Sequence, residues 1–155
     1  MQSHPSPCAH VCTPTSSAHR VTEAEQSLLE QYTASQTNAF LQLFRLAQRH
    51  LGTGGGDTAA KVLLGLYNGR RFPFALTELR RFDDNNLAAA ITAIATDAGH
   101  CCAEVHEVLN ALLGRTSVGH ELELMAYYLR LPKRCKAAEL QALRRLVARD
   151  AGGAA

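Results

Sequence analysis

The sequence predicts an all-α protein, an irregular bundle of about six or seven short helices that follow a disordered N-terminal tail. Apolar residues recur at helical spacing along most of the chain, and glycines or prolines separate the periodic segments. No segment shows the period-2 alternation of a strand. Of the 155 residues, 46% are hydrophobic and 19% are charged, a balance typical of one globular domain.

The chain divides into a predicted tail at residues 1–21 and a predicted single helical domain at residues 22–150. The first twenty residues contain three prolines, many serines and threonines and no periodic apolar pattern, which is typical of disorder. They lack the apolar run of a secretory leader, and no stretch approaches the roughly 18 apolar residues of a membrane span. We therefore expect a cytoplasmic protein with reduced cysteines and no membrane contact.

The first helix is expected to begin at Thr22, because Glu25 three residues later completes a capping-box signature. The pattern continues through SLLEQYT, weakens around residues 35–37 and sharpens again from Asn38. One apolar stripe with helical spacing then follows, made of Phe40, Leu43, Phe44, Ala47 and Leu51. Gly52 is predicted to end this helix.

The GTGGG run at residues 52–56 is predicted to be a flexible linker, with Asp57 as the N-cap of the next helix. That helix, TAAKVLLGLYN, should end at Gly69. Pro73 favours an extended RRFPF segment, and Thr77 is expected to cap the short helix TELRRF.

Asp83 or Asp84 is predicted to cap the helix NNLAAAITAIATDA, which should end at Gly99. Three further helices are predicted at residues 101–113, 118–130 and 135–149. Gly114 is expected to end the first of them and Pro132 the second.

The stretch HCCAEVH at residues 100–106 concentrates potential metal ligands. On a helix, Cys102 and His106 would share a face and need a third ligand such as His120 or Cys135. Cys102 would also lie on an apolar stripe, where a free cysteine usually packs as a small hydrophobic residue. Packing is therefore the favoured interpretation, and we predict no metal site.

Other candidate chemistry in the sequence is weaker. The potential ligands in the first twenty residues, His4, Cys8, His10, Cys12 and His19, lack a second pair at zinc spacing. The glycine run follows a predicted helix and precedes an aspartate, which does not fit a phosphate loop. There is no Gly-x-Ser-x-Gly elbow, and the helix after the polar turn at residues 83–86 offers Ala, Ile and Thr rather than base-reading side chains. We predict no enzymatic activity and no cofactor.

The basic C-terminal region is one candidate interaction surface. Residues 130–150 hold seven Lys or Arg residues against two acidic residues, whereas the whole chain has a net charge of +2. The candidate contact residues are Lys133, Arg134, Lys136, Arg144 and Arg145. These charges form either a solvated helix face or a contact for phosphate groups or an acidic protein.

A second candidate surface surrounds the phenylalanines near Pro73. Its residues are Arg70, Arg71, Phe72, Phe74, Arg80 and Arg81. The aromatic residues form either a packed corner between two helices or an exposed anchor for a partner, with the arginines at its edges.

Three segments resemble a family of small helical proteins of unknown function that are encoded on bacterial mobile and integrative elements. They are FLQLFRLAQRHLG (40–52), VLLGLYNGRRFPFALTEL (62–79) and EVHEVL (104–109). Ala75 stands where this family usually has an acid, so no role of that acid is carried over. The resemblance covers residues 40–109 and implies a helical accessory protein, with no reaction or cofactor.

We therefore expect a non-enzymatic protein–protein interaction or accessory protein, a factor of a mobile element that is directed at host proteins. The alternative is a sequence-nonspecific nucleic-acid-associated protein that uses the basic C-terminal helix. The sequence leaves the identity of the protein partner and the oligomeric state open.

Overall fold

A computed structural model describes residues 22–99 and 102–131, and this part of the chain contains helices, turns and loops but no strand. Its helical segments are α1 (Glu23–Leu29), α2 (Ala34–His50), α3 (Gly54–Asn68), the 3-10 helix η1 (Leu76–Arg81), α4 (Asp84–Gly99), α5 (Val105–Leu113) and α6 (Val118–Tyr128). The predicted all-α class is confirmed. None of these helices is long and apolar enough to cross a membrane. The predicted tail and the predicted helix at 135–149 lie outside the described residues.

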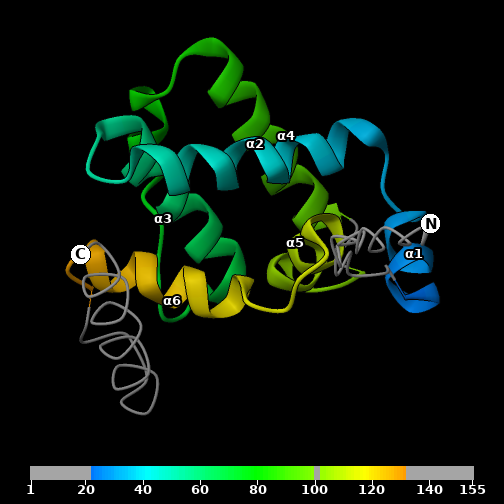
Figure 1. Cartoon of the computed structure of the whole chain (residues 1–155). Helices are drawn as coiled ribbons and strands as arrows, with labels where there is room; N and C mark the ends of the chain where they lie inside the picture. Colours follow the sequence, from blue (N-terminus) through cyan, green and yellow to red (C-terminus); the bar gives the residue numbers. More distant parts are fainter. Residues whose placement is uncertain (1–21, 100–101, 132–155) are drawn as a thin grey trace, which may run out of the picture.

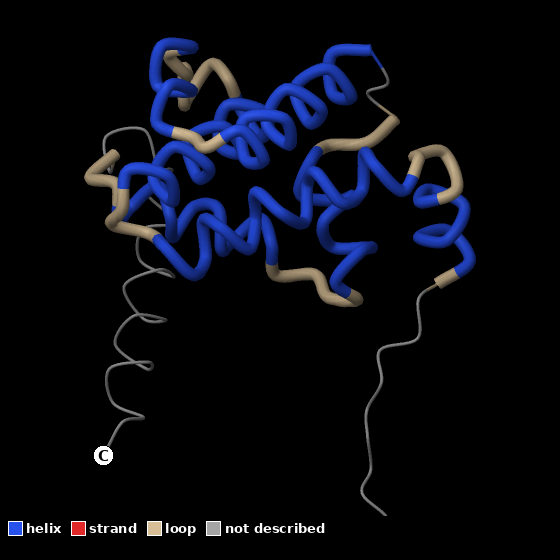
Figure 2. Tube along the Cα trace, turned by 90° about the horizontal axis from the view of Figure 1, so that it is seen from above, coloured by secondary structure: helices blue, strands red, loops and turns tan. Residues whose placement is uncertain are grey.

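Helix α2 is the centre of the bundle (Figure 1), whose described part consists of helices joined by loops (Figure 2). It packs along α3, crosses α4 and contacts α5, while α6 packs on α3 and α5. Helix α1 contacts α5 at one end of the molecule, and the last turn of α6 lies at the opposite end (Figure 1). The fully buried side chains that join these helices include Phe44, Leu63, Leu109 and Leu122. Burial of each such side chain contributes about 1.5–3 kcal/mol to folding.

The predicted capping box at Thr22 is confirmed, but the helix that it begins is shorter than predicted. Helix α1 ends at Leu29, and a second capping box starts α2: the Thr33 hydroxyl accepts from the Gln36 N–H at 3.3 Å, and the Gln36 side chain accepts from the Thr33 N–H at 2.8 Å. Between the helices, Tyr32 turns into the core. Two local caps therefore divide what the periodicity indicated as one helix.

The apolar stripe predicted for α2 is confirmed by burial. Phe40, Leu43, Phe44 and Ala47 are buried, and Leu51 packs partly buried against the same core. The stripe faces α3 and α4, because its spacing keeps these side chains on one side of the helix.

The prediction of a flexible linker at the glycine run is wrong. Helix α3 begins at Gly54, with Thr53 as its N-cap, so that Asp57 lies inside the helix. The Asp57 carboxylate accepts a hydrogen bond from the Gly52 N–H at 2.7 Å, and Gly52 adopts a left-handed φ of 95°. A Cβ on Gly56 would overlap the His50 carbonyl, so glycine permits the close approach of α2 and α3 at this turn.

Two more predicted boundaries differ in the structure. Asp83 caps α4 as expected, since its carboxylate accepts from the Asn86 N–H at 2.8 Å, but Thr77 lies inside η1 and caps nothing. The predicted helix at 101–113 begins only at Val105, after the Glu104 N–H donates to the Glu107 carboxylate at 3.0 Å. Cys102 therefore precedes the helix and is exposed, rather than lying on its apolar stripe.

Candidate protein-binding surface

The segment between α3 and α4 is anchored to the core at intervals. Phe72 is only 2% exposed, and Leu79 and Phe82 pack partly buried against the same core. Phe74 lies against α3, where a Cβ added at Gly65 would approach the Phe74 Cβ to 3.3 Å. The segment is thus held in place although most of it lacks α-helical structure.

A buried ion pair fixes the start of this segment to α6. The Arg71 guanidinium donates two hydrogen bonds to the Glu123 carboxylate, at 2.5 Å and 2.8 Å. Glu123 is 1% exposed, and the same guanidinium lies 4.7 Å from the centre of the Phe72 ring. Paired, hydrogen-bonded geometry of this kind is what allows a carboxylate to be buried in a core.

A second ion pair holds the 3-10 helix. Lys61 on α3 donates to the Glu78 carboxylate at 2.6 Å, and both side chains are partly buried. Glu78 therefore faces inward, and the opposite side of η1 faces solvent. The two ion pairs and the buried aromatic rings make this segment a firm platform for its exposed residues.

The segment runs back along α3 from Asn68 past Lys61 to Gly54, and we call its exposed residues together the Leu76 surface. Its members are Arg70, Pro73, Ala75, Leu76, Thr77, Arg80 and Arg81. Leu76 is 69% exposed, more than Ile91 or Tyr128, the other exposed large hydrophobic side chains among the described residues. Arg70, Arg80 and Arg81 form no ion pair with a described residue. The surface therefore combines one protruding apolar side chain with unneutralised positive charge.

The structure separates the residues of the predicted surfaces. Phe72 lies in the core and Arg71 pairs with Glu123, whereas Arg70, Arg80 and Arg81 are exposed and Phe74 is partly buried. The basic C-terminal candidates, Lys133, Arg134, Lys136, Arg144 and Arg145, lie outside the described residues. The sequence did not indicate that Leu76 is exposed. The segment around it is too short to show a periodic apolar pattern, so its spacing does not distinguish a buried leucine from an exposed one.

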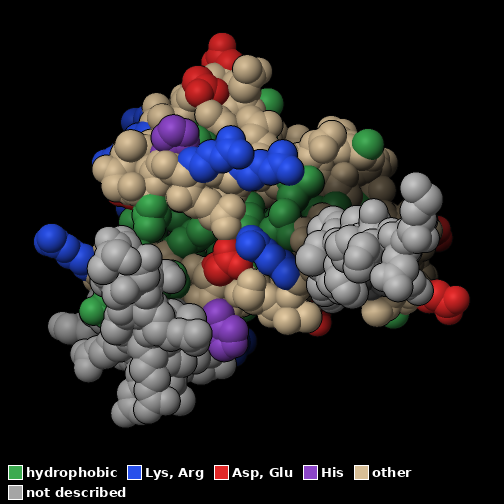
Figure 3. Space-filling view, in the orientation of Figure 1, with side chains coloured by type: hydrophobic (Ala, Val, Ile, Leu, Met, Phe, Trp, Pro, Cys, Tyr) green, Lys and Arg blue, Asp and Glu red, His purple; other side chains and the backbone are tan. Residues whose placement is uncertain are grey.

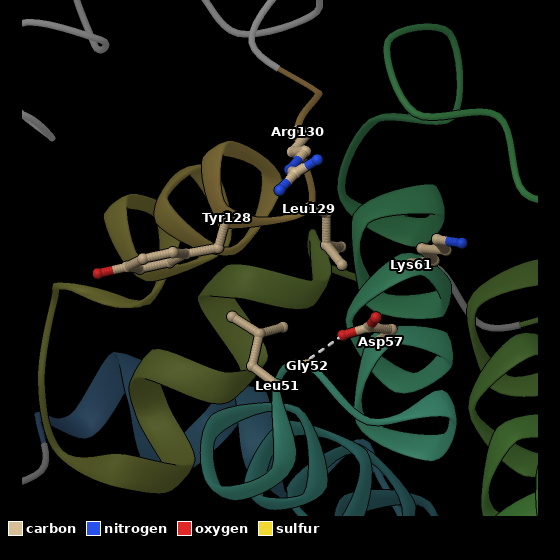
Figure 4. A pocket seen from close by; sticks show the side chains of 7 residues that line it. All are labelled: Leu51, Gly52, Asp57, Lys61, Tyr128, Leu129 and Arg130. Atoms are coloured by element: carbon tan, nitrogen blue, oxygen red, sulfur yellow. Dashed lines mark hydrogen bonds between the residues drawn. The ribbon is translucent and has the colours of Figure 1, made fainter.

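The pocket at the end of α6 has a volume of about 380 Å³ (Figure 4). Its walls are Leu51, Gly52, Asp57, Lys61, Tyr128, Leu129 and Arg130. Asp57 is bonded to the Gly52 N–H and Lys61 to Glu78, while the Tyr128 ring extends away from the cavity (Figure 4). These walls bring together no nucleophile with an adjacent base, which is the arrangement that acyl transfer needs.

A hollow between α2 and α6 carries a small polar network. Its carboxylate, Glu121, accepts from Gln48 at 2.7 Å, from Arg115 at 3.0 Å and from the Ser117 hydroxyl at 2.8 Å. Hydrophobic side chains gather in this hollow, and Lys or Arg side chains lie along α2 beside it (Figure 3). Every Glu121 contact is an internal hydrogen bond, so the network fixes α6 against α2.

The potential ligands Cys102 and His106 do not share a helical face, because Cys102 precedes α5. The His106 ring instead packs edge-on against Tyr67, with 5.2 Å between ring centres. Within residues 22–99 and 102–131, no three His, Cys, Asp or Glu side chains are grouped to hold a metal ion. His100, Cys101 and Cys135 lie outside these ranges.

Asp97 near the end of α4 gives a pH-dependent prediction. Burial, with a further contribution from the charge of Glu104, raises the pKa of Asp97 above its usual value of 3.8. Ionised Asp97 therefore destabilises the fold, and this penalty appears as pH rises from the unfolded-state pKa through the folded-state pKa. We expect Asp97→Asn to stabilise the protein at pH 7 by less than about 1 kcal/mol, because the site is partly solvated.

Urea unfolding of wild type and Asp97→Asn at neutral and strongly acidic pH measures this difference. The gain should vanish below the unfolded-state pKa, where the carboxyl is protonated in both states. An equal gain at both pH values would show that the side-chain amide, rather than the lost charge, stabilises the variant.

The described helices make this an all-α protein with an exposed leucine and three exposed arginines on the segment between α3 and α4. The chain belongs to the family of unknown function DUF7673, whose model matches residues 37–117, from α2 to the start of α6. The expected relation to a family of unknown function is thereby confirmed. No curated protein and no solved structure matches the chain.

Proposed function

We propose that the protein is a non-enzymatic interaction or accessory protein that binds an acidic partner protein through the Leu76 surface. The observation that carries this proposal is the 69% exposure of Leu76 on a segment with three unneutralised arginines. A protruding leucine fits an apolar pocket, and the arginines select a partner whose pocket has an acidic rim. The two ion pairs below the surface keep it preformed, which lowers the entropy lost on binding.

The finer proposal is that this accessory protein is encoded on a bacterial mobile element and acts on host proteins in the cytoplasm. It is supported by the resemblance of residues 40–52, 62–79 and 104–109 to proteins of such elements. Under this finer proposal, the acidic partner protein is a protein of the host. The nucleic-acid alternative depends on residues 133–145, outside the described part of the chain, and stays a prediction.

The test compares proteins that wild type and three variants retain from a lysate of the cells that encode the protein. The variants are Leu76→Asp, the double variant Arg80→Glu with Arg81→Glu, and the control Tyr128→Asp. Tyr128 is 53% exposed and lies at the end of α6, away from the Leu76 surface. Tyr128→Asp therefore replaces an exposed hydrophobic side chain by an aspartate, as Leu76→Asp does, but at a different place. A partner captured by wild type is then purified and its affinity measured for each variant.

We expect Leu76→Asp to weaken binding at least about 30-fold, because a central apolar anchor contributes about 2 kcal/mol or more. The double arginine variant should weaken binding and reduce its dependence on salt, while Tyr128→Asp binds as wild type does. If wild type, Leu76→Asp and the arginine variant retain the same proteins with the same affinity, the proposal is wrong. Circular dichroism of each variant confirms that the helices persist.

A further inference from the structure

Helix α1 is attached to the rest of the described structure through few buried contacts. Helices α2 to α6 each bury four or more residues, whereas none of the seven residues of α1 is buried. The main contact of α1 is with α5, at one end of the molecule (Figure 1). Among the described residues, Leu28 is the α1 side chain that packs partly buried against the core. One leucine therefore supplies most of the apolar burial that holds α1 in place.

A groove of about 310 Å³ remains between α1 and α5. Its α1 side is formed by Ala24, Glu25 and Leu28, and its other side includes Glu107 and Asn110 of α5. Side chains that leave such a space between them lose part of the contact that a close-packed interior provides. The contact between α1 and α5 is therefore looser than the buried contacts among α2, α3 and α4.

The chain directly after α1 is fixed independently of it. Tyr32 is buried, and its ring lies edge-on to the ring of Phe40 in α2, with 6.4 Å between the ring centres. The capping box of Thr33 and Gln36 then starts α2. Residues 30 and 31 thus join α1 to an anchored segment, and a movement of α1 can end there without disturbing α2.

We propose that α1 is a strap that detaches from α5 as one unit while α2 to α6 remain folded. A helix of seven residues is not stable by itself in water, so α1 unfolds when it leaves α5. Opening uncovers the other side of the groove, with Glu107, Asn110 and Thr116. The family model matches the chain only from residue 37, after α1, so the shared domain does not include the strap. The strap uses no residue of the Leu76 surface, so the two proposals are tested independently.

Hydrogen exchange of the full-length chain at increasing urea concentration measures this opening. We expect the hydrogen-bonded amides of α1, from Gln26 to Glu30, to exchange at least about 100-fold faster than the buried amides of α3. Urea should change the α1 rates little, because opening of α1 exposes little surface, and should raise the α3 rates steeply. Equal rates and equal urea dependence in α1 and α3 would overturn the proposal. So would rates that fall steadily from Gln26 to Glu30, since they indicate fraying from one end.

Two adjacent substitutions in α1 complete the test. Leu28→Asp places a charge at the anchor, so it should speed exchange in α1 at least about 10-fold and leave the α3 rates within about 3-fold of wild type. Ser27→Asp is the matched control, because Ser27 is exposed and receives the same charge in the same helix. It should leave the α1 rates within about 3-fold of wild type. If Leu28→Asp speeds exchange equally in α1 and α3, or in neither, α1 is no separate strap and the proposal is wrong.

Discussion

Replacing Glu123 by alanine is expected to lower the free energy of unfolding by about 3–5 kcal/mol, since Arg71 would lose its buried bidentate partner. Glu123 is 1% exposed, and both of its oxygens accept from the guanidinium. The Arg71 guanidinium beside the Phe72 ring would lose both of these hydrogen bonds at a position where its side chain is only 17% exposed. Urea unfolding followed by circular dichroism measures the loss.

The matched control is Glu78→Ala, which breaks the more exposed ion pair with Lys61. We expect this loss to be about 1 kcal/mol or less, because the Lys61 side chain is 30% exposed and its ammonium can be solvated once the carboxylate is removed. If both variants lose the same stability, the burial of Glu123 has no special energetic effect. Because the buried pair joins the segment below Leu76 to α6, Glu123→Ala should also weaken partner binding at temperatures where the protein is still folded.

Replacing Gly56 by alanine is expected to destabilise the fold by about 3 kcal/mol or more, near the upper end of overpacking effects. A Cβ at this position would overlap the backbone carbonyl of His50, which cannot move aside as a flexible side chain could. That carbonyl also accepts the Thr53 N–H at 3.0 Å and the Thr53 hydroxyl at 2.7 Å, so the strain would spread through the turn.

Gly55→Ala provides the control within the same run of glycines. A Cβ at Gly55 would meet nothing within 4 Å, and the residue lies in the first turn of α3. Alanine should therefore stabilise the protein by about 0.5–1 kcal/mol, because glycine is a poor helix former. If both substitutions stabilise the fold, the glycine run is exchangeable and the close approach of α2 to α3 is not needed. Thermal unfolding of the two variants distinguishes these results.

The parts of the fold that depend on neighbouring residues could be predicted from the sequence. The capping box at Thr22, the cap at Asp83 and the helix stop at Gly114 each require contacts within a few residues. The buried stripe of α2 follows from spacing alone, because a helix repeats its faces every 3.6 residues. These features gave the all-α class and most of the helix order.

Local patterns misplaced residues whose environment is set by distant parts of the chain. The glycine run has a linker composition, but the approach of α2 to α3 makes it the first turn of a helix. Cys102 fits the spacing of an apolar stripe, but α5 begins three residues later and leaves it exposed. In both cases the composition was compatible with two structures, and packing selected one of them.

The candidate site shows the same division. The sequence by itself determined that an arginine-flanked phenylalanine segment separates two helices, because Pro73 and the turn residues act locally. Only the tertiary structure decided that Arg71 and Phe72 are buried while Leu76 projects, since Glu123 lies 52 residues further along the chain. Neighbouring residues in the sequence determine the local backbone structure of a segment. Whether a side chain of that segment is buried depends on which distant helices pack over it.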